Sequence, residues 1–463
     1  MNSDTDTIAA IATAPGEGAI SIVRVSGPDS LGIADAIVRC AGPRPSERKA
    51  NTFFHAFVRP PAGTREESQP ADVDEVIVLV YRAPHSFTRE DVLEIQGHGG
   101  RLAAQRVLRA ALLAGARPAE PGEFTKRAFL SGRIDLLQAE AVLDVIRARS
   151  DRASMAAMEQ LEGGLSRQIL RQYDALITLA ADMEACLDFP EQDLPAIPIA
   201  RLAERTGSVI REMDQVLGSW HDGHILRDGA LVVIIGKPNV GKSTLFNCLL
   251  DRERAIVHDL PGTTRDSIEE ELVLSGVPVR LIDTAGIREP QCLIEKKSID
   301  RSMSYLEKAD LFLDVLDASV PLDNDDLRVL AATPPERCLV VMNKADIGLG
   351  VDISQLSGRE CVRAILTRNE GIDQIRRAII NRIGLTCSVL QHAVISERHR
   401  DLLTGAASRL RESKRMLDTG ENADLSIASA EIRESLDLVG QIIGRVHYDD
   451  LLSSVFSRFC IGK

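Results

Sequence analysis

Short apolar runs and polar turns alternate over the first 120 residues of this chain. Four β-branched runs predict strands at Thr7–Thr13, Ala19–Val25, Glu75–Tyr81 and Val92–Ile95. The stretch 60–70, which is rich in Pro, Gly, Glu and Ser, predicts a polar loop between the second and third runs. Together these segments indicate a mixed α/β unit.

The pattern changes to a helical period at about residue 122. Apolar residues from Ile134 to Ile146 recur at spacings of three and four, which predicts one apolar helix face. The same period returns after about Val394, with apolar positions from Ile432 to Ile443 on one face. Residues near 225–385 instead alternate between strand and helix patterns. Helices on both flanks predict one helical domain built from two chain segments, with the α/β domain inserted between them.

Composition narrows the class of protein. A chain of 463 residues is too long to fold around a single hydrophobic core, so two or three domains are expected. A net charge of −13 argues against a global electrostatic attraction to RNA or membranes, and 3% aromatic residues disfavour stacking platforms for single-stranded nucleic acid. The eight cysteines include no C-x-x-C pair, which indicates reduced thiols. Without a signal pattern or a long apolar run, we expect a cytoplasmic protein that does not span a membrane.

The strongest chemical signal follows the buried-strand pattern Leu231–Ile235. The next eight residues, Gly236–Ser243, match the phosphate-binding loop G-x-x-x-x-G-K-S/T. Its backbone N–H groups and the start of a helix over Thr244–Leu250 favour a triphosphate. Lys242 is expected to reach the β- and γ-phosphates, and Ser243 to ligate Mg2+. The predicted nucleotide contacts of this loop are Asn239, Val240, Gly241, Lys242, Ser243 and Thr244.

Two further motifs turn the nucleotide site into a candidate GTPase. The strand pattern Val279–Ile282 ends in Asp283, Thr284, Ala285 and Gly286, where the aspartate can hold Mg2+ through water and the glycine can contact the γ-phosphate. The strand pattern Cys338–Met342 ends in Asn343, Lys344, Ala345 and Asp346. An Asn-Lys-x-Asp motif binds guanine, because its carboxylate accepts from the ring N1–H and the exocyclic amine, a donor pair that adenine lacks.

The region between these motifs predicts the switch chemistry. Thr264, in the run Gly262–Asp266, is the predicted switch threonine on Mg2+. Ile287 stands where Ras-like enzymes have the glutamine that orients water, so another group must do that work or hydrolysis is slow. Asn239 could hold a monovalent cation beside the phosphates in place of an arginine finger. An ordinary turn residue is the alternative for Asn239.

The segments outside the nucleotide motifs resemble the MnmE (TrmE) family of bacterial tRNA-modification GTPases over essentially the whole chain. The segments that carry the resemblance are Asp6–Ile8, Ile22–Gly27, Phe87–Gly100, Pro121–Phe124, Arg127–Leu130, Asp135–Ala141 and Phe459–Lys463. The resemblance implies a fold of α/β and α parts. These are an N-terminal α+β folate-binding and dimerisation domain (1–120), a helical domain in two segments (121–222 and 387–463) and an inserted Ras-like G domain (223–386).

The resemblance also implies an activity. The family, with the flavin- and NADH-using partner MnmG, adds a carboxymethylaminomethyl or aminomethyl group to C5 of the wobble uridine of certain tRNAs. The carbon comes from a tetrahydrofolate derivative, in its 5,10-methylene or 5-formyl form. GTP hydrolysis requires K+, Mg2+ and dimerisation of G domains. We therefore expect a homodimer, and a heterotetramer with MnmG.

Residue roles carry over by position. Glu295 matches the glutamate that orients the catalytic water, and Cys460 the tail cysteine tied to the modification step. The implied metal ligands are Asn239, Ser243, His258, Leu260, Thr263 and Thr264. Further implied nucleotide contacts are Asp259, Pro261 and Gly262. The implied folate contacts are Arg24, Glu94, Arg133 and Lys463.

This chain departs from the family pattern at three places. Arg133 replaces a lysine, which keeps the charge but changes the shape of the contact. His258 and Pro261 replace threonine and alanine, and Ile365–Thr367 stands where Ser-Ala-Lys usually supports the guanine. A regulatory GTPase of ribosome assembly is the alternative function. Such a factor needs neither the folate-like domain nor the Phe-Cys-Ile-Gly-Lys ending, and it more often carries a basic RNA-binding module.

Overall fold

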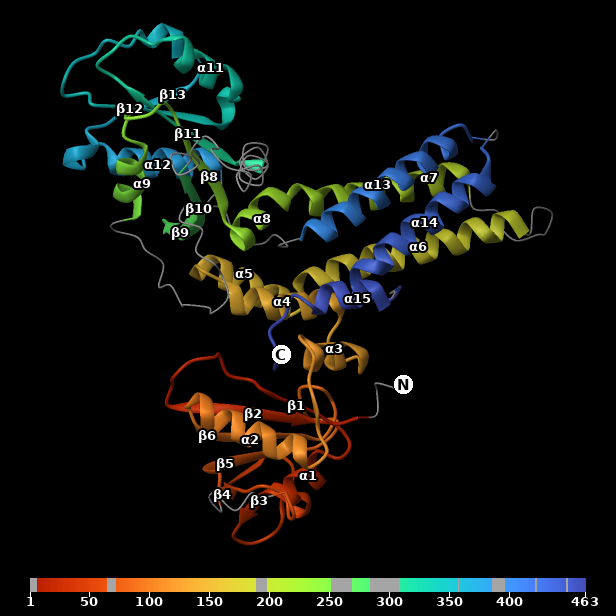
Figure 1. The fold of residues 1–463 in the computed structure, drawn as a ribbon. Helices are drawn as coiled ribbons and strands as arrows, with labels where there is room; N and C mark the ends of the chain where they lie inside the picture. Colours follow the sequence, from red (N-terminus) through yellow and green to blue (C-terminus); the bar gives the residue numbers. More distant parts are fainter. Residues whose placement is uncertain are drawn as a thin grey trace, which may run out of the picture. The chain divides into compact units, whose positions relative to one another are not determined.

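The computed structural model forms two compact units (Figure 1). The first comprises Met1–Leu143 with Gly440–Lys463, and the second Asp144–Val439. The residues that the structure describes are 6–64, 72–188, 198–250, 269–283, 308–356, 358–384, 396–420, 423–446 and 449–463.

The first unit is built on a seven-stranded sheet in the order β3-β4-β5-β6-β2-β1-β7. Its strands are β1 Ile8–Ile11, β2 Ile20–Ser26, β3 Val38–Cys40, β4 Thr52–Val58, β5 Asp74–Tyr81, β6 Val92–His98 and β7 Arg117–Pro118. The four predicted strands are confirmed as β1, β2, β5 and β6. The sequence pattern did not predict β3, β4 and β7. Strand β4 carries Phe53 and Phe57 at outward positions next to the buried Phe54, Ala56 and Val58, which obscures the apolar alternation.

Two helices cover one face of this sheet. Helices α1 (Ser30–Ile37) and α2 (Arg101–Leu113) pack their apolar residues on Val23, Val78 and Ile95. Because side chains alternate across a strand, the neighbouring positions Arg24 and Glu94 point to the opposite face. The antiparallel register of β2 and β6 sets these two residues directly opposite each other.

The last residues of the sequence belong to the same unit. Helices α3 (Glu123–Leu130), α4 (Leu136–Arg147) and α15 (Asp449–Phe456) meet in a core that includes Leu136, Phe456 and Phe459. Beyond it the chain runs along β1, since a Cβ on Gly462 (φ +96°) would overlap the Ile11 carbonyl oxygen. This close approach brings Lys463 to the sheet.

The second unit contains a six-stranded sheet in the order β13-β12-β11-β8-β10-β9. Its strands are β8 Ala230–Ile235, β9 Glu269–Leu274, β10 Val277–Asp283, β11 Leu311–Asp317, β12 Cys338–Asn343 and β13 Glu360–Arg363. All pairs are parallel except β9 with β10. The predicted strands β8, β10 and β12 are confirmed, as is the helix after the phosphate loop, α9 (Lys242–Leu250).

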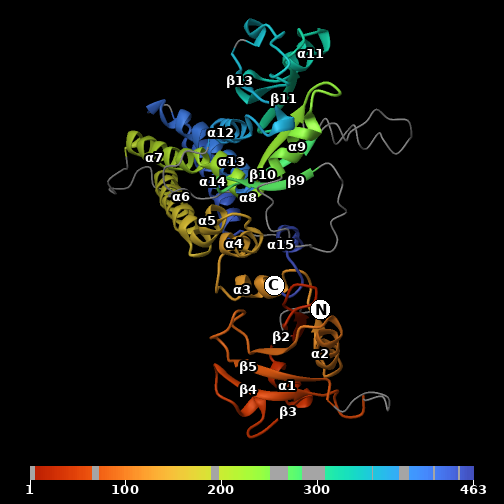
Figure 2. The same cartoon turned by 90° about the vertical axis from the view of Figure 1, so that its left-hand side faces the viewer.

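The other long elements described in the second unit are helices (Figures 1 and 2). They are α5 Asp151–Leu161, α6 Gly164–Asp188, α7 Ile199–Gly218, α8 Trp220–Asp228, α11 Asn324–Ala332, α12 Ile372–Ile383, α13 Glu397–Leu417 and α14 Leu425–Ile443. Helix α7 packs on both α6 and α13, so helices from before and after the sheet lie side by side. Among the described helices, none is long and apolar enough to cross a membrane.

Candidate functional site

The phosphate loop depends on two glycines. Gly236 follows β8 with φ +133°, and a Cβ there would overlap the Val315 carbonyl oxygen. Gly241 has φ +109°, and a Cβ there would overlap the Asn343 amide nitrogen. No other residue adopts these conformations in so little space, so both glycines of the motif are required by packing. Asn239 also has a positive φ, of +63°, and its side chain is exposed.

Lys242 and Ser243 lie where the motif predicts. The Lys242 ammonium donates to the carbonyl oxygens of Gly236 and Lys237 at 2.8 and 2.7 Å. Burial lowers the pKa of Lys242, and the charge of Asp283 opposes that effect. The Ser243 hydroxyl donates to Asp283 Oδ2 at 2.9 Å, so the two oxygens predicted to serve Mg2+ are neighbours.

The guanine motif is joined to the phosphate loop. The buried Asn343 amide donates to the Val240 carbonyl at 2.8 Å and accepts from the Leu366 backbone N–H at 3.2 Å. Lys344 donates to Asp317 at 2.6 Å. Asp346 lies 3.7 Å from the guanidinium of Arg368, which follows the segment that departs from Ser-Ala-Lys. The backbone near Leu366 therefore supports Asn343, and an arginine lies beside Asp346.

Several predicted residues of this site lie outside the described residues. They are His258, Asp259, Leu260, Pro261, Gly262, Thr263, Thr264, Thr284, Ala285, Gly286 and Glu295. Their roles stay predictions.

The first unit brings three of the predicted folate contacts together. Arg24 Nε donates to Glu94 Oε1 at 2.9 Å, and the Arg24 guanidinium lies 5.6 Å from the ring centres of Phe87 and Phe124. Burial lowers the pKa of Lys463; the charge of Arg24 adds to this effect, while Glu94 opposes it. The charges of residues 24, 94 and 463 thus lie close enough to act on one another, although the residues are far apart in the chain.

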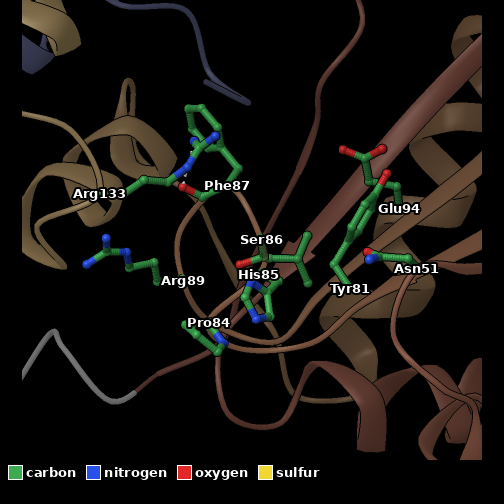
Figure 3. Close-up of a pocket in the computed structure, with 10 residues that line it drawn as sticks. Asn51, Tyr81, Pro84, His85, Ser86, Phe87, Arg89, Glu94 and Arg133 are labelled. Atoms are coloured by element: carbon green, nitrogen blue, oxygen red, sulfur yellow. Dashed lines mark hydrogen bonds between the residues drawn. The ribbon is translucent and has the colours of Figure 1, made fainter. Parts of the chain in front are cut away.

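A cavity of about 550 Å³ opens beside Glu94 (Figure 3). It falls within the range of roughly 300–1,000 Å³ that is typical of ligand pockets. Its described lining is Asn51, Tyr81, Pro84, His85, Ser86, Phe87, Arg89, Val92, Glu94 and Arg133. Arg133 donates to the Phe87 carbonyl at 3.1 Å, with its guanidinium 4.8 Å from the Phe87 ring centre. The fourth predicted folate contact therefore lines this cavity with Glu94.

Other residues of the resembling segments form an ion-pair network in the first unit. The buried Arg127 donates to Asp6 at 2.6 Å and to Glu90 and Glu123 at 3.1 Å. Arg117 donates to Asp6 and Glu123 at 2.6 Å. This network connects the start of β1 with α3. Arg127 and Glu123 therefore hold the fold of the first unit together, which explains their presence in the resembling segments.

Cys460 is exposed, and its carbonyl oxygen accepts from the Gly122 N–H at 3.3 Å. A Cβ on Gly122, which has φ +69°, would lie 2.7 Å from the Phe456 carbonyl oxygen. The tail therefore passes directly over the start of α3, with the thiol free to meet other groups.

Two family models match this chain. The MnmE helical domain matches residues 136–460, and the GTP-binding protein TrmE N-terminus matches residues 7–133. The chain belongs to the MnmE family. A protein named tRNA modification GTPase MnmE from Geobacter metallireducens is 44% identical over 462 residues, which is 99% of each chain. The protein of that name from Aquifex aeolicus is 39% identical over 460 residues, 99% of this chain and 100% of its own.

Among solved structures, the FeoB G-domain from Methanococcus jannaschii is 24% identical, covering 33% of this chain and 97% of its own, with a TM-score of 0.25.

Two residues of this MnmE-family chain have a place in the structure that the sequence pattern did not predict. Asp314 is fully buried in the middle of β11, and neither carboxylate oxygen has a hydrogen-bonding partner among the described residues. Arg89 lines the cavity with a positive φ of +61°. An acid within an apolar strand pattern was the available signal for Asp314, whereas no local pattern marks Arg89.

Proposed function

We propose that this chain is a K+-dependent GTPase that modifies tRNA together with an MnmG-type flavoprotein. It adds a carboxymethylaminomethyl or aminomethyl group to C5 of the wobble uridine, using the carbon of 5,10-methylene- or 5-formyl-tetrahydrofolate. The observation that carries the proposal is the meeting of Arg24, Glu94 and Lys463 beside a cavity, in a chain that also holds a phosphate loop. The names of its relatives, tRNA modification GTPase MnmE, support the tRNA-modification and GTPase parts of the proposal.

The described nucleotide residues suit magnesium and GTP. Lys242 now donates to two loop carbonyls, and these donors would turn to the β- and γ-phosphate oxygens. The Ser243 hydroxyl and the Asp283 carboxylate are the hard oxygen ligands that Mg2+ prefers. Asp346 would accept from the guanine N1–H and amine. Residues that suit GTP in this way are the basis for the hydrolase part of the proposal.

K+ would supply positive charge next to the phosphates, in place of an arginine finger. Asn239 offers an exposed amide oxygen at the loop for this ion. Glu295 would orient the attacking water, the role of the glutamine that Ile287 replaces. Glu295 and the switch ligands come from the resemblance.

The cavity in the first unit suits a reduced pteridine. Such a ring presents adjacent N–H donors, and the Glu94 carboxylate can accept them while Arg24 holds it in place. Phe87 adds an aromatic surface to the same cavity. Cys460 follows Phe459 of the core next to the sheet and is exposed, as a residue that takes part in the modification step must be.

The assembly is also part of the proposal. The protein acts in the cytoplasm as a homodimer and forms a heterotetramer with MnmG. Its G domain is inserted into the helical domain, an arrangement supported by the packing of α7 on α13. The boundaries near residues 120, 222 and 386 follow from the same resemblance.

Mass spectrometry of tRNA nucleosides tests the proposal. A strain that lacks this gene is complemented with the wild type, with Arg24→Ala, with Lys242→Ala, or with Arg106→Ala as a control. Arg106 is exposed on α2, across the sheet from Glu94. Aminomethyl-type uridines should be restored by the wild type and by the control, and reduced at least tenfold in the other two.

The outcomes separate the parts of the proposal. An unchanged nucleoside profile in the deletion strain would refute the modification role and favour ribosome assembly. Normal modification by Arg24→Ala alone would refute the folate site and leave the GTPase role intact.

A further inference from the structure

Arg89 combines two unusual properties. It adopts a left-handed backbone conformation, with φ +61°, which is uncommon for a residue other than glycine, asparagine or aspartate. Its side chain is exposed and lines the cavity beside Phe87. Non-glycine residues held in this region often lie at ligand sites, where the required position of the side chain outweighs the strain.

The local contacts hold the Arg89 guanidinium in place. Its Nη1 donates to the Ser131 carbonyl oxygen at 2.8 Å, and that contact uses one of five N–H donors. Gly132 lies next to this guanidinium, since a Cβ on it would be 3.8 Å from the same Nη1. The loop after α3 thus positions Arg89.

Arg133 supplies a second positive charge next to Arg89. It is positioned by its bond to the Phe87 carbonyl and by the Phe87 ring. Loss of hydration lowers the pKa of Arg133, and the charge of Arg89 lowers it further, so the two guanidinium groups repel each other. Glu94 is the one acid in the described cavity lining, and Arg24 is bonded to it.

The cavity therefore has positive charge on one side and a carboxylate acceptor on the other. Figure 3 shows Arg89 and Arg133 on one side, and Glu94, Tyr81 and Asn51 on the other. A ligand that suits both sides carries N–H donors at one end and anionic groups at the other. Folates have this chemistry, with a pteridine head and a glutamate tail.

We propose that Arg89 and Arg133 form a two-arginine clamp for the tail carboxylates, and that this site prefers folates extended by γ-linked glutamates. The inference rests on the folate site proposed above. Each guanidinium can hold a carboxylate through two parallel N–H donors, and a longer tail offers one more carboxylate for each added residue. A lone glutamate carries two carboxylates, so a longer tail strengthens binding by placing further negative charge within reach of the two guanidinium groups.

Equilibrium binding to the full-length protein tests the clamp. The probes are 5-formyl-tetrahydrofolate with one glutamate and with three, measured by calorimetry at about 50 mM salt. Because the arginines are exposed, we expect about tenfold tighter binding of the triglutamate by the wild type, and a smaller ratio at high salt. Arg89→Gln should weaken binding of the triglutamate more than binding of the monoglutamate, and so bring the ratio near one.

Arg106→Gln removes the same charge from α2 and should keep the wild-type ratio. Arg89→Lys should restore part of it, since the charge remains but the fork is lost. A wild-type ratio near one, or an unchanged ratio in Arg89→Gln, would overturn the clamp and leave the folate site standing. If neither the monoglutamate nor the triglutamate binds, the folate site and the clamp are both overturned. An Arg89→Gln protein with weaker tRNA binding and an unchanged ratio would assign Arg89 to tRNA phosphates.

Discussion

Replacing Asp314 by asparagine should stabilise the G-domain sheet at alkaline pH. Asp314 lies on β11 beside the phosphate loop strand, in register with Ile235. Burial raises the pKa of its carboxyl to about 7, and the charge of Asp326 contributes, while Arg359 and Lys242 act in the opposite direction. Neither Asp314 oxygen has a hydrogen-bonding partner among the described residues.

The pKa gives the size and the pH window of the effect. The unfolded carboxyl ionises near pH 3.8 and the folded one near pH 7, so the native state holds an extra proton between these values. Stability therefore falls as pH rises through this window, and the full cost is present above about pH 7. About three pH units at roughly 1.4 kcal/mol each correspond to about 4 kcal/mol.

Asparagine keeps the shape and cannot ionise, but its amide still lacks the described partners. We expect a gain of about 3 kcal/mol at pH 8, or roughly 6–12 °C in Tm, and less than about 1 kcal/mol at pH 4.5. Calorimetry of the full-length protein measures this, with the G-domain transition identified as the one that GDP shifts upward.

Asp325→Asn is the matched control, because its side chain is 68% exposed in the same domain. It should change Tm by little at either pH. If Asp314→Asn shifts Tm equally at pH 4.5 and pH 8, or lowers stability at pH 8, then ionisation of the buried carboxyl does not destabilise the fold.

Three further predictions concern the binding sites. Asn343→Ala should weaken GTP binding about 10- to 100-fold, since it leaves the buried Val240 carbonyl unpaired; an unchanged Kd by calorimetry would contradict this. Gly462→Ala should displace the tail from the Ile11 carbonyl and weaken folate binding at least tenfold, while GTP affinity stays constant; equal loss of both would indicate unfolding. GTP hydrolysis should be faster in KCl than in NaCl, and Asn239→Ala should remove the difference; equal wild-type rates in a phosphate-release assay would exclude the cation mechanism.

Local patterns predicted those parts of the fold that depend on neighbouring residues. The strands β8 and β12 are apolar runs, β10 is an apolar run interrupted by Arg280 alone, and each of the three is followed by a recognisable motif and is confirmed. The central strand β11 was not predicted, because Asp314 interrupts its apolar run and none of the nucleotide motifs follows it. Strand β11 is buried by its neighbouring strands β12 and β8 and by the helices α11 and α12. These elements are too far from it in the chain to be read from a short stretch of sequence.

The sequence by itself determined the phosphate loop, since strand, glycines, lysine and serine follow one another within thirteen residues of chain, Leu231–Ser243. Only the tertiary structure decided that Arg24 meets Glu94, that Lys463 interacts with both, and that Arg89 faces the same cavity as Arg133. Backbone geometry and side-chain period act over a few residues. Strand register, tail packing and burial, which set these contacts and the pKa of Asp314, arise only when distant segments pack together.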